Sequence, residues 1–250
     1  MTAMHFTASD TPSAQEAQAR LTARYGQVPL ASAQVIVALG GDGLMLSVLH
    51  RHSGLPVYGM NRGTIGFLMN DYAEEDLPER IAAAEETVTN PLSMVAGAAD
   101  GHVHKALAIN EVSLLRAGPQ AAKLQISVNG RIRLDELVCD GALLCTPAGS
   151  TAYNYSAHGP ILPMGSDVLG LTAIAAFRPR RWRGAILPKS ALVRFDVLEP
   201  EKRPVMADAD SRKVDSVEWV EIRSAPDIAH RILFDPGHGM EERLMREQFV

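Results

Sequence analysis

The chain has 250 residues, of which 46% are hydrophobic and 21% charged, and its formal net charge at pH 7 is −5. This composition is that of an ordinary soluble globular protein with one large or two small domains. The acidic balance argues against a nucleic-acid-binding protein, which carries a basic face. Residues 168–177 form the most apolar window, and they are too few for a membrane-crossing helix, which needs roughly 20 residues.

The first 90 residues alternate between strand and helix patterns. Residues 34–39 are apolar on both faces, which indicates a parallel strand covered by helices. Strands are predicted at residues 4–8, 34–39 and 56–60, and helices at residues 12–25, 44–52 and 74–86. This alternating order predicts a small doubly wound α/β domain.

Near Asn90-Pro91 the pattern changes to strands and turns. Asn129-Gly130 is a strong hairpin signal, because apolar residues alternate on both sides of it, and Asp100-Gly101 is a second. Further strands are predicted at residues 138–145, 169–177, 191–198, 217–223 and 230–234, with short helices at 150–157 and 240–249. We therefore expect an α/β domain at residues 1–90, with residues 235–250 packing back on it, and an all-β, sandwich-type domain at residues 91–234.

The two cysteines, Cys139 and Cys145, both fall in the predicted strand 138–145. On one strand they would lie about 20 Å apart, at roughly 3.3 Å per residue. A disulfide requires Cα atoms within about 7 Å. We expect free thiols and, from these together with the lack of a basic N-terminal leader, a cytoplasmic protein.

The turn Gly40-Gly41-Asp42-Gly43 joins the strand at 34–39 to a helix. It is not a dinucleotide fingerprint, because Leu46 stands where glycine is required, and the chain has no Gly-Lys pair for a P-loop. Free N–H groups and the helix dipole make such a turn a natural anion site. We predict a phosphate-bearing ligand here, with Asp42 taking the proton of an attacking hydroxyl. The alternative is a plain turn with a capping aspartate.

Two further polar motifs interrupt apolar stretches. Asn61-Arg62-Gly63 follows the next strand, and because neighbouring strand ends share one crevice, we expect it beside Asp42. Asn110-Glu111 lies within the apolar residues 106–115. Adjacent strand residues face opposite ways, so one of the two should point inward. A buried glutamate is costly without a partner, and ligand hydroxyls would supply donors. The alternative is a bulge at the surface.

Residues 146–156 gather six hydroxyl side chains around a glycine turn that opens a helix. Such a segment suits a sugar, a phosphate or an adenine edge, and the alternative is an ordinary helix cap. It is not a nucleophile elbow, because Ala148 stands where glycine would be needed. The arginines at 178, 180, 181 and 183 surround Trp182; they suit donor phosphates, a neighbouring subunit or solvent equally. No metal site is predicted, because the histidines lack further ligands at zinc spacing.

Taken together, these motifs resemble the NAD kinase family. The matching pieces occur in the family's order over roughly residues 33–235, and they are Gly40-Gly-Asp-Gly43, Asn61-Arg-Gly-Thr-Ile-Gly-Phe-Leu68, Asn110-Glu111, Asp140-Gly141, Thr146-Pro-Ala-Gly-Ser-Thr-Ala-Tyr153, Ser156 and Gly159-Pro160. The resemblance implies transfer of the γ-phosphoryl group of ATP to the 2′-hydroxyl of the adenosine ribose of NAD, giving NADP. It also implies a homodimer or homotetramer, with Mg²⁺ or another divalent cation on the donor phosphates.

The resemblance also assigns roles by position. Asp42 would accept the proton, and Gly43 would border the dinucleotide. Residues that would bind NAD are Asn110, Glu111, Asp140, Ala148, Thr151, Ala152, Tyr153, Asn154, Tyr155 and Ser156. Leu44, Ala148 and Asp210 depart from the family's usual residues, which bears on donor preference and inhibition more than on the reaction. A lipid or sugar kinase with the same glycine turn, and a non-catalytic NAD(P) sensor, remain the alternatives.

Overall fold

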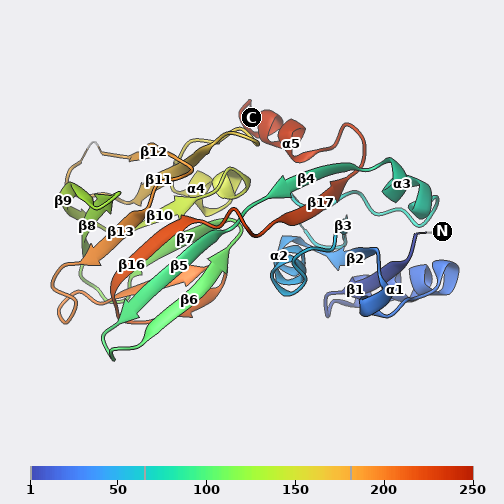
Figure 1. The fold of residues 1–250 in the computed structure, drawn as a ribbon, viewed down its shortest axis with the longest axis horizontal. Helices are drawn as coiled ribbons and strands as arrows, with labels where there is room; N and C mark the ends of the chain where they lie inside the picture. The colour runs from blue at the N-terminus through green and yellow to red at the C-terminus, as the bar shows by residue number, and fades with distance from the viewer. Residues whose placement is uncertain (1, 65, 181, 250) are drawn as a thin grey trace. The chain divides into compact units, whose positions relative to one another are not determined.

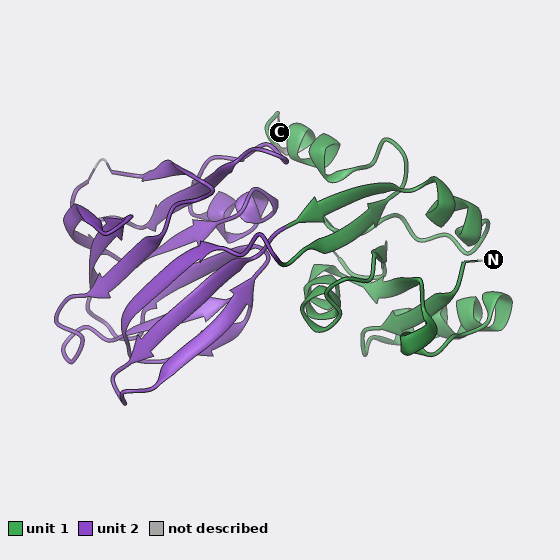
Figure 2. Cartoon of the chain, viewed as in Figure 1, with its two compact units in different colours: residues 1–89, 228–250 green, residues 90–227 purple. Residues whose placement is uncertain are grey.

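The computed structural model describes residues 2–64, 66–180 and 182–249 (Figure 1). The chain forms two compact units (Figure 2): residues 1–89 with 228–250, here called the α/β unit, and residues 90–227, here called the β unit. Ile65 of the second glycine motif and Arg181 of the arginine-rich segment lie outside the described residues. None of the described helices is long and apolar enough to span a membrane.

The α/β unit is built on one sheet, which among the described residues has five strands in the order β1-β2-β3-β17-β4. The first four are parallel, and β4 runs antiparallel to β17. The strands are β1 (Met4–Ala8), β2 (Val35–Gly40), β3 (Val57–Asn61), β17 (His230–Phe234) and β4 (Glu85–Thr89). The helices are α1 (Pro12–Tyr25), the short η1 (Leu30–Ser32), α2 (Asp42–Arg51), α3 (Leu77–Ala83) and α5 (Met240–Glu247).

Every residue of β2 is buried, as its apolar pattern predicts for a parallel strand covered on both faces. Leu21 of α1 and Leu77 of α3 pack in one cluster with Val37 of β2 and Tyr58 of β3. The helix α2 contacts β2 and β3. This packing fixes the carboxyl end of β2, from which the glycine turn leaves.

The β unit contains two antiparallel sheets, each with six strands among the described residues. One sheet consists of β12 (Gly184–Pro188), β11 (Val168–Ile174), β10 (Gly141–Cys145), β7 (Glu111–Arg116), β14 (Val205–Ala209) and β15 (Arg212–Val214). The other consists of β6 (Val103–Ala108), β5 (Leu92–Ala98), β16 (Val217–Ser224), β13 (Val193–Val197), β8 (Ala122–Val128) and β9 (Arg131–Cys139). Inward-facing residues of both sheets form one core cluster, which makes the unit a β-sandwich. The predicted fold class, a small α/β domain followed by a sandwich-type β domain, is therefore confirmed.

The Asn129-Gly130 hairpin forms as predicted between β8 and β9. Asn129 has φ of 52° and Gly130 has φ of 73°, the positive angles that a tight two-residue hairpin requires. The short helix predicted at 150–157 is split into a 3₁₀ turn, η2 (Ala148–Thr151), and α4 (Tyr153–Ser156).

Three predicted elements were wrong in place or extent. The strand at 230–234 forms, but it joins the α/β sheet, because Ile232, Leu233 and Phe234 are all buried and need cover on both faces. The predicted helix 74–86 ends at Ala83, because the β-branched residues that follow prefer the strand β4. The predicted strand 138–145 breaks at Asp140, so Cys139 and Cys145 lie on different strands; both are buried, free thiols.

Candidate active site

Asp42 is the first residue of α2, directly after the turn that ends β2. Its carboxylate accepts two backbone hydrogen bonds, from the N–H of Phe67 to Oδ2 at 2.9 Å and from the N–H of Leu68 to Oδ1 at 2.8 Å. Burial raises the pKa of Asp42 above its ordinary value, while these two N–H groups and the charge of Arg243 lower it. The result is an oriented carboxylate with increased proton affinity, as a general base requires.

The second glycine loop lies directly against the first, as predicted. The N–H of Arg62 donates to the carbonyl of Gly40 at 2.7 Å. A Cβ added to Gly63 would stand 3.3 Å from the Cα of Gly41, so the two loops approach at backbone distance. Gly43 faces open space, where a Cβ would meet nothing within 4 Å. The juncture of the two loops therefore leaves backbone groups accessible beside Asp42.

In the β unit, Asn110 and Glu111 stand at the start of β7, and Asp210 fixes their backbone. The carboxylate of Asp210 accepts from the N–H groups of Ile109 at 2.5 Å, Asn110 at 3.2 Å and Glu111 at 3.4 Å. Asp210 directly follows β14, in the turn to β15, and has φ of 46°. This clamp determines where the side chains of Asn110 and Glu111 point.

Glu111 is the inward-pointing member of the pair. Its Oε2 is buried, and the described residues offer it no hydrogen-bond partner. Burial raises the pKa of Glu111 to about 8, and the charges of Asp210 and Asp208 add to this, against the backbone N–H of Tyr153. A buried polar atom without a partner needs a ligand or water. The predicted role as a group that meets ligand hydroxyls fits this geometry.

Residues 146–154 are built onto the Asn110 loop. The hydroxyl of Thr146 donates to the carbonyl of Ile109 at 2.7 Å and accepts from the N–H of Gly149 at 3.0 Å. A Cβ on Gly149 would lie 2.2 Å from the carbonyl oxygen of Asn110, so glycine is required there. The turn and the Asn110-Glu111 motif are therefore one rigid assembly.

The candidate residues 148–156 divide into buried and accessible ones. Ala148 and Asn154 are buried. The amide of Asn154 is occupied by the carbonyls of Ser150 and Pro160, at 2.9 Å each, and by the hydroxyl of Thr172 at 2.6 Å. The partly or fully exposed members are Thr151, Ala152, Tyr153, Tyr155 and Ser156. Asn154 thus holds the turn through its buried amide, and the other members are accessible at the surface.

Asp140 lies apart from Glu111, at the break between β9 and β10, and its Oδ1 accepts from Nε of Arg116 at 2.5 Å. Asp140, Arg116 and Tyr153 line an open pocket of about 500 Å³. The arginine-rich segment lines a different pocket, of about 370 Å³, through Arg180, Trp182 and Arg183. The described residues that line this second pocket do not include Asn110 or Glu111.

Two residues of the site were missed by sequence reasoning. The sequence marks Asp210 only as a departure from a family pattern, although an aspartate at the end of a strand is suited to bind consecutive backbone N–H groups. Arg243 follows Met240 by three positions on the predicted C-terminal helix, which places it beside the buried face. That spacing was the available signal for it.

An oriented carboxylate beside two glycine loops, at the start of a helix, is suited to a phosphotransferase that acts on an alcohol group. The model of the ATP-NAD kinase N-terminal domain matches residues 1–87, and that of the ATP-NAD kinase C-terminal domain matches residues 109–232. An NAD kinase of Cereibacter sphaeroides is 69% identical over 247 residues, 98% of this chain and 97% of that protein. An NAD kinase of Caulobacter vibrioides is 59% identical over 251 residues, 100% of this chain and 96% of that protein.

Solved structures show the same fold. The yeast NADH kinase complexed with NADH has a TM-score of 0.85 at 21% identity, covering 100% of this chain and 87% of that one. The NAD kinase from Archaeoglobus fulgidus in complex with ATP has a TM-score of 0.77 at 22% identity, covering 98% and 96%. The chain belongs to the NAD kinase family. It is therefore an enzyme, a kinase, and the lipid kinase, sugar kinase and sensor alternatives are set aside.

Proposed function

We propose that this chain transfers the γ-phosphoryl group of ATP to the 2′-hydroxyl of the adenosine ribose of NAD, with Asp42 as the proton acceptor. The observation that carries the proposal is the carboxylate of Asp42, held by two backbone N–H groups beside two glycine loops. Each carboxylate oxygen has two acceptor positions. One N–H at each oxygen therefore leaves a position free for the ribose hydroxyl.

In the reaction, the ribose oxygen forms a bond to the γ-phosphorus as the bond from that phosphorus to the β,γ-bridging oxygen breaks. The hydroxyl proton goes to Asp42, and ADP leaves with the bond electrons. Catalysis of this kind depends on positioning and on charge neutralisation. The amides of the turn at Gly41 to Gly43, at the start of α2, are suited to the transferred phosphoryl group because a helix N-terminus favours anions.

For the acceptor, we propose that Glu111 and Asn110 bind hydroxyl groups of NAD. The orphaned Oε2 of Glu111 supports this, because a ribose hydroxyl would satisfy it. The accessible residues of 151–156 are suited to the adenosine side, and Ala148 and Asn154 to shaping it. Asp140, in its open pocket with Tyr153, is suited to another part of the dinucleotide.

For the donor, the proposal includes Mg²⁺ or another divalent cation, which enters with ATP as part of the substrate and neutralises phosphate charge. The described residues contain no group of three or more His, Cys, Asp or Glu side chains that would hold a metal by themselves. The donor phosphates would therefore supply the main ligands of the cation.

We also propose a cytoplasmic homodimer or homotetramer. The free thiols of Cys139 and Cys145 support the compartment. Exposed Ile186, on the edge strand β12, and exposed Phe177 support an interface between copies of the chain. Light scattering on the purified chain gives the number of subunits.

The experiment is an assay of the purified full chain with MgATP and NAD, in which the product is detected by an NADP-specific dehydrogenase. NAD lacking the adenosine 2′-hydroxyl is the matched control and should give no product. NADH and inorganic polyphosphate, each in a separate reaction, define the acceptor and donor range. Absence of NADP formation from MgATP and NAD would overturn the proposal.

A further inference from the structure

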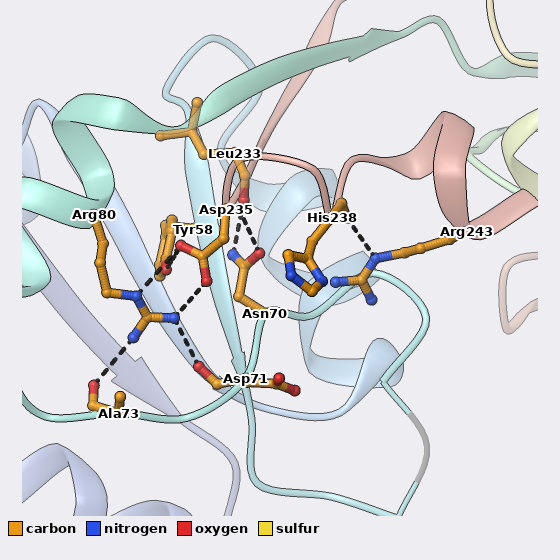
Figure 3. Close-up of polar contacts among 9 residues, drawn as sticks. All are labelled: Tyr58, Asn70, Asp71, Ala73, Arg80, Leu233, Asp235, His238 and Arg243. Atoms are coloured by element: carbon orange, nitrogen blue, oxygen red, sulfur yellow. Dashed lines mark hydrogen bonds and ion pairs between the residues drawn. The ribbon is translucent and has the colours of Figure 1, made fainter.

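The segment that follows β17 is fixed to the α/β unit by a network around Asp235 (Figure 3). The hydroxyl of Tyr58 donates to Oδ1 of Asp235 at 2.5 Å, and Nη2 of Arg80 donates to its Oδ2 at 2.5 Å. Asn70 donates to the carbonyl of Leu233 at 3.0 Å and accepts from the N–H of Asp235 at 2.9 Å. Asn70 ends the second glycine loop, so this network joins that loop to the start of the C-terminal segment.

Arg243, on α5, makes a second connection to the same loop. Its Nη1 donates to the carbonyls of Gly66 and Phe67, at 3.1 Å each. Its Nε donates to the carbonyl of His238 at 2.8 Å, and its guanidinium lies 5.1 Å from the ring centroid of Phe234. Figure 3 shows the side chain reaching from α5 past His238. These contacts hold the guanidinium in one orientation.

The two carbonyls that Arg243 binds belong to the two peptide groups that hold Asp42. The carbonyl of Gly66 and the N–H of Phe67 are one planar peptide group, and the carbonyl of Phe67 and the N–H of Leu68 are the next. Both N–H groups donate to the carboxylate of Asp42. A cation at the carbonyl end of a peptide group fixes its plane and polarises its N–H, which strengthens the hydrogen bond on the other side.

We propose that Arg243 is a positioning residue for phosphoryl transfer, aligning the two peptide groups that orient the carboxylate of Asp42. The inference rests on the proposed role of Asp42 as the proton acceptor. It assigns to the C-terminal helix α5 a part in the reaction.

The charges around the pair set the direction of the pH effect. The charge of Arg243 lowers the pKa of Asp42, against the larger effect of burial. Burial lowers the pKa of Arg243, and the charge of Arg246 adds to this, against the charges of Asp71, Asp42 and Asp235. Without the cation the pKa of Asp42 rises further, so Asp42 becomes protonated at a higher pH. The acidic limb of the kcat/KM profile then moves to higher pH.

The experiment compares Arg243→Met, Arg243→Lys and Arg246→Met in the full chain, using pH profiles of kcat/KM, kcat and KM for both substrates, and Tm. Arg246 is the matched control, because it lies on the same helix but is exposed and pairs with Glu242 at 3.0 Å. We expect Arg243→Met to lower kcat by tenfold to about 10²-fold, the loss that a misplacement of about 1 Å produces, and to move the acidic limb upward. Arg243→Lys keeps the charge but loses the planar guanidinium and the Nε bond to His238 that holds it in one orientation. It should lose kcat while its acidic limb stays close to that of the wild type.

The control should match the wild type in every measurement. A loss of kcat in Arg243→Met with an unmoved acidic limb would show a merely structural role and overturn the proposal. If Arg243→Met does not fold, Arg243→Lys decides, and a wild-type kcat in that variant overturns the proposal. Asp42→Asn, measured alongside, separates the proposed role of Asp42 from that of Arg243. If Asp42→Asn retains activity, the role of Asp42 fails; if it is inactive and the Arg243 variants behave as the wild type, only the inference on Arg243 fails.

Discussion

Replacing Gly149 by alanine should displace the Asn110-Glu111 motif and weaken NAD binding. A Cβ at this position would lie 2.2 Å from the carbonyl oxygen of Asn110 and 2.5 Å from its Cα. Both neighbours are backbone atoms, held by Thr146 and by the Asp210 clamp. Restoring an ordinary contact therefore moves the motif by about 1 Å. A displacement of this size can lower kcat/KM for NAD by about 10²-fold.

The same clash lowers stability. Overpacking a tightly fitted site costs about 1–3 kcal/mol, which for a chain of this size corresponds to a fall in Tm of about 2–12 °C. Thermal unfolding followed by circular dichroism measures the stability, and steady-state kinetics with varied NAD measure the KM. Gly118→Ala is the control, because its Cβ would meet only Pro204, at 3.7 Å, and it should keep the Tm of the wild type. A Gly149→Ala variant with wild-type Tm and wild-type KM for NAD would refute the reasoning.

Three further changes test separate parts of the structure. Because the pKa of Glu111 is raised to about 8, the folded protein keeps a proton that the unfolded chain loses, and its stability falls as the pH rises from about 4.5 to about 8. Glu111→Gln should therefore show a smaller fall in Tm over that pH range. A Tm that depends on pH as in the wild type would contradict this prediction. Asp235→Asn removes a charge paired with Arg80 and should lower the free energy of unfolding by about 1.5–3 kcal/mol in urea denaturation. The control, Glu86→Gln at the exposed pair with Arg231, should lower it by only about 0–1 kcal/mol. Equal losses in the two variants would argue against a stabilising network around Asp235. Burial raises the pKa of Cys139 and of Cys145 to about 12 each, so iodoacetamide should label them only after unfolding, and rapid labelling of the folded chain would be inconsistent with this packing.

The sequence was sufficient where local pattern and burial agree. The apolar strand at 34–39, the glycine turn after it and the Asn129-Gly130 hairpin all form where their residues predict. The strand at 230–234 was assigned to the wrong domain, because its partners β3 and β4 are more than a hundred residues earlier in the chain. A strand's own residues carry no signal for so distant a pairing.

The candidate site divides in the same way. Asp42 and the second glycine loop were predicted together, because neighbouring parallel strands bring their ends to one edge. The clamp of Asp210 and the contact of Arg243 were not predicted. Each depends on a side chain binding backbone groups about 100 residues away or more, and any backbone offers such groups, so no residue pattern marks the partner.

Turnover of Asp42→Asn tests the central claim most directly. The variant keeps the shape of the side chain and an oxygen that can accept a backbone hydrogen bond, but it cannot take a proton at neutral pH. Measured in the NADP-forming assay with saturating MgATP and NAD, it should bind NAD with a similar Kd and lose about 10²–10⁴-fold in kcat. It should fold, with a Tm lower by only a few degrees, because the amide nitrogen cannot accept one of the two backbone hydrogen bonds. A kcat close to that of the wild type would contradict the assignment of Asp42 as the proton acceptor.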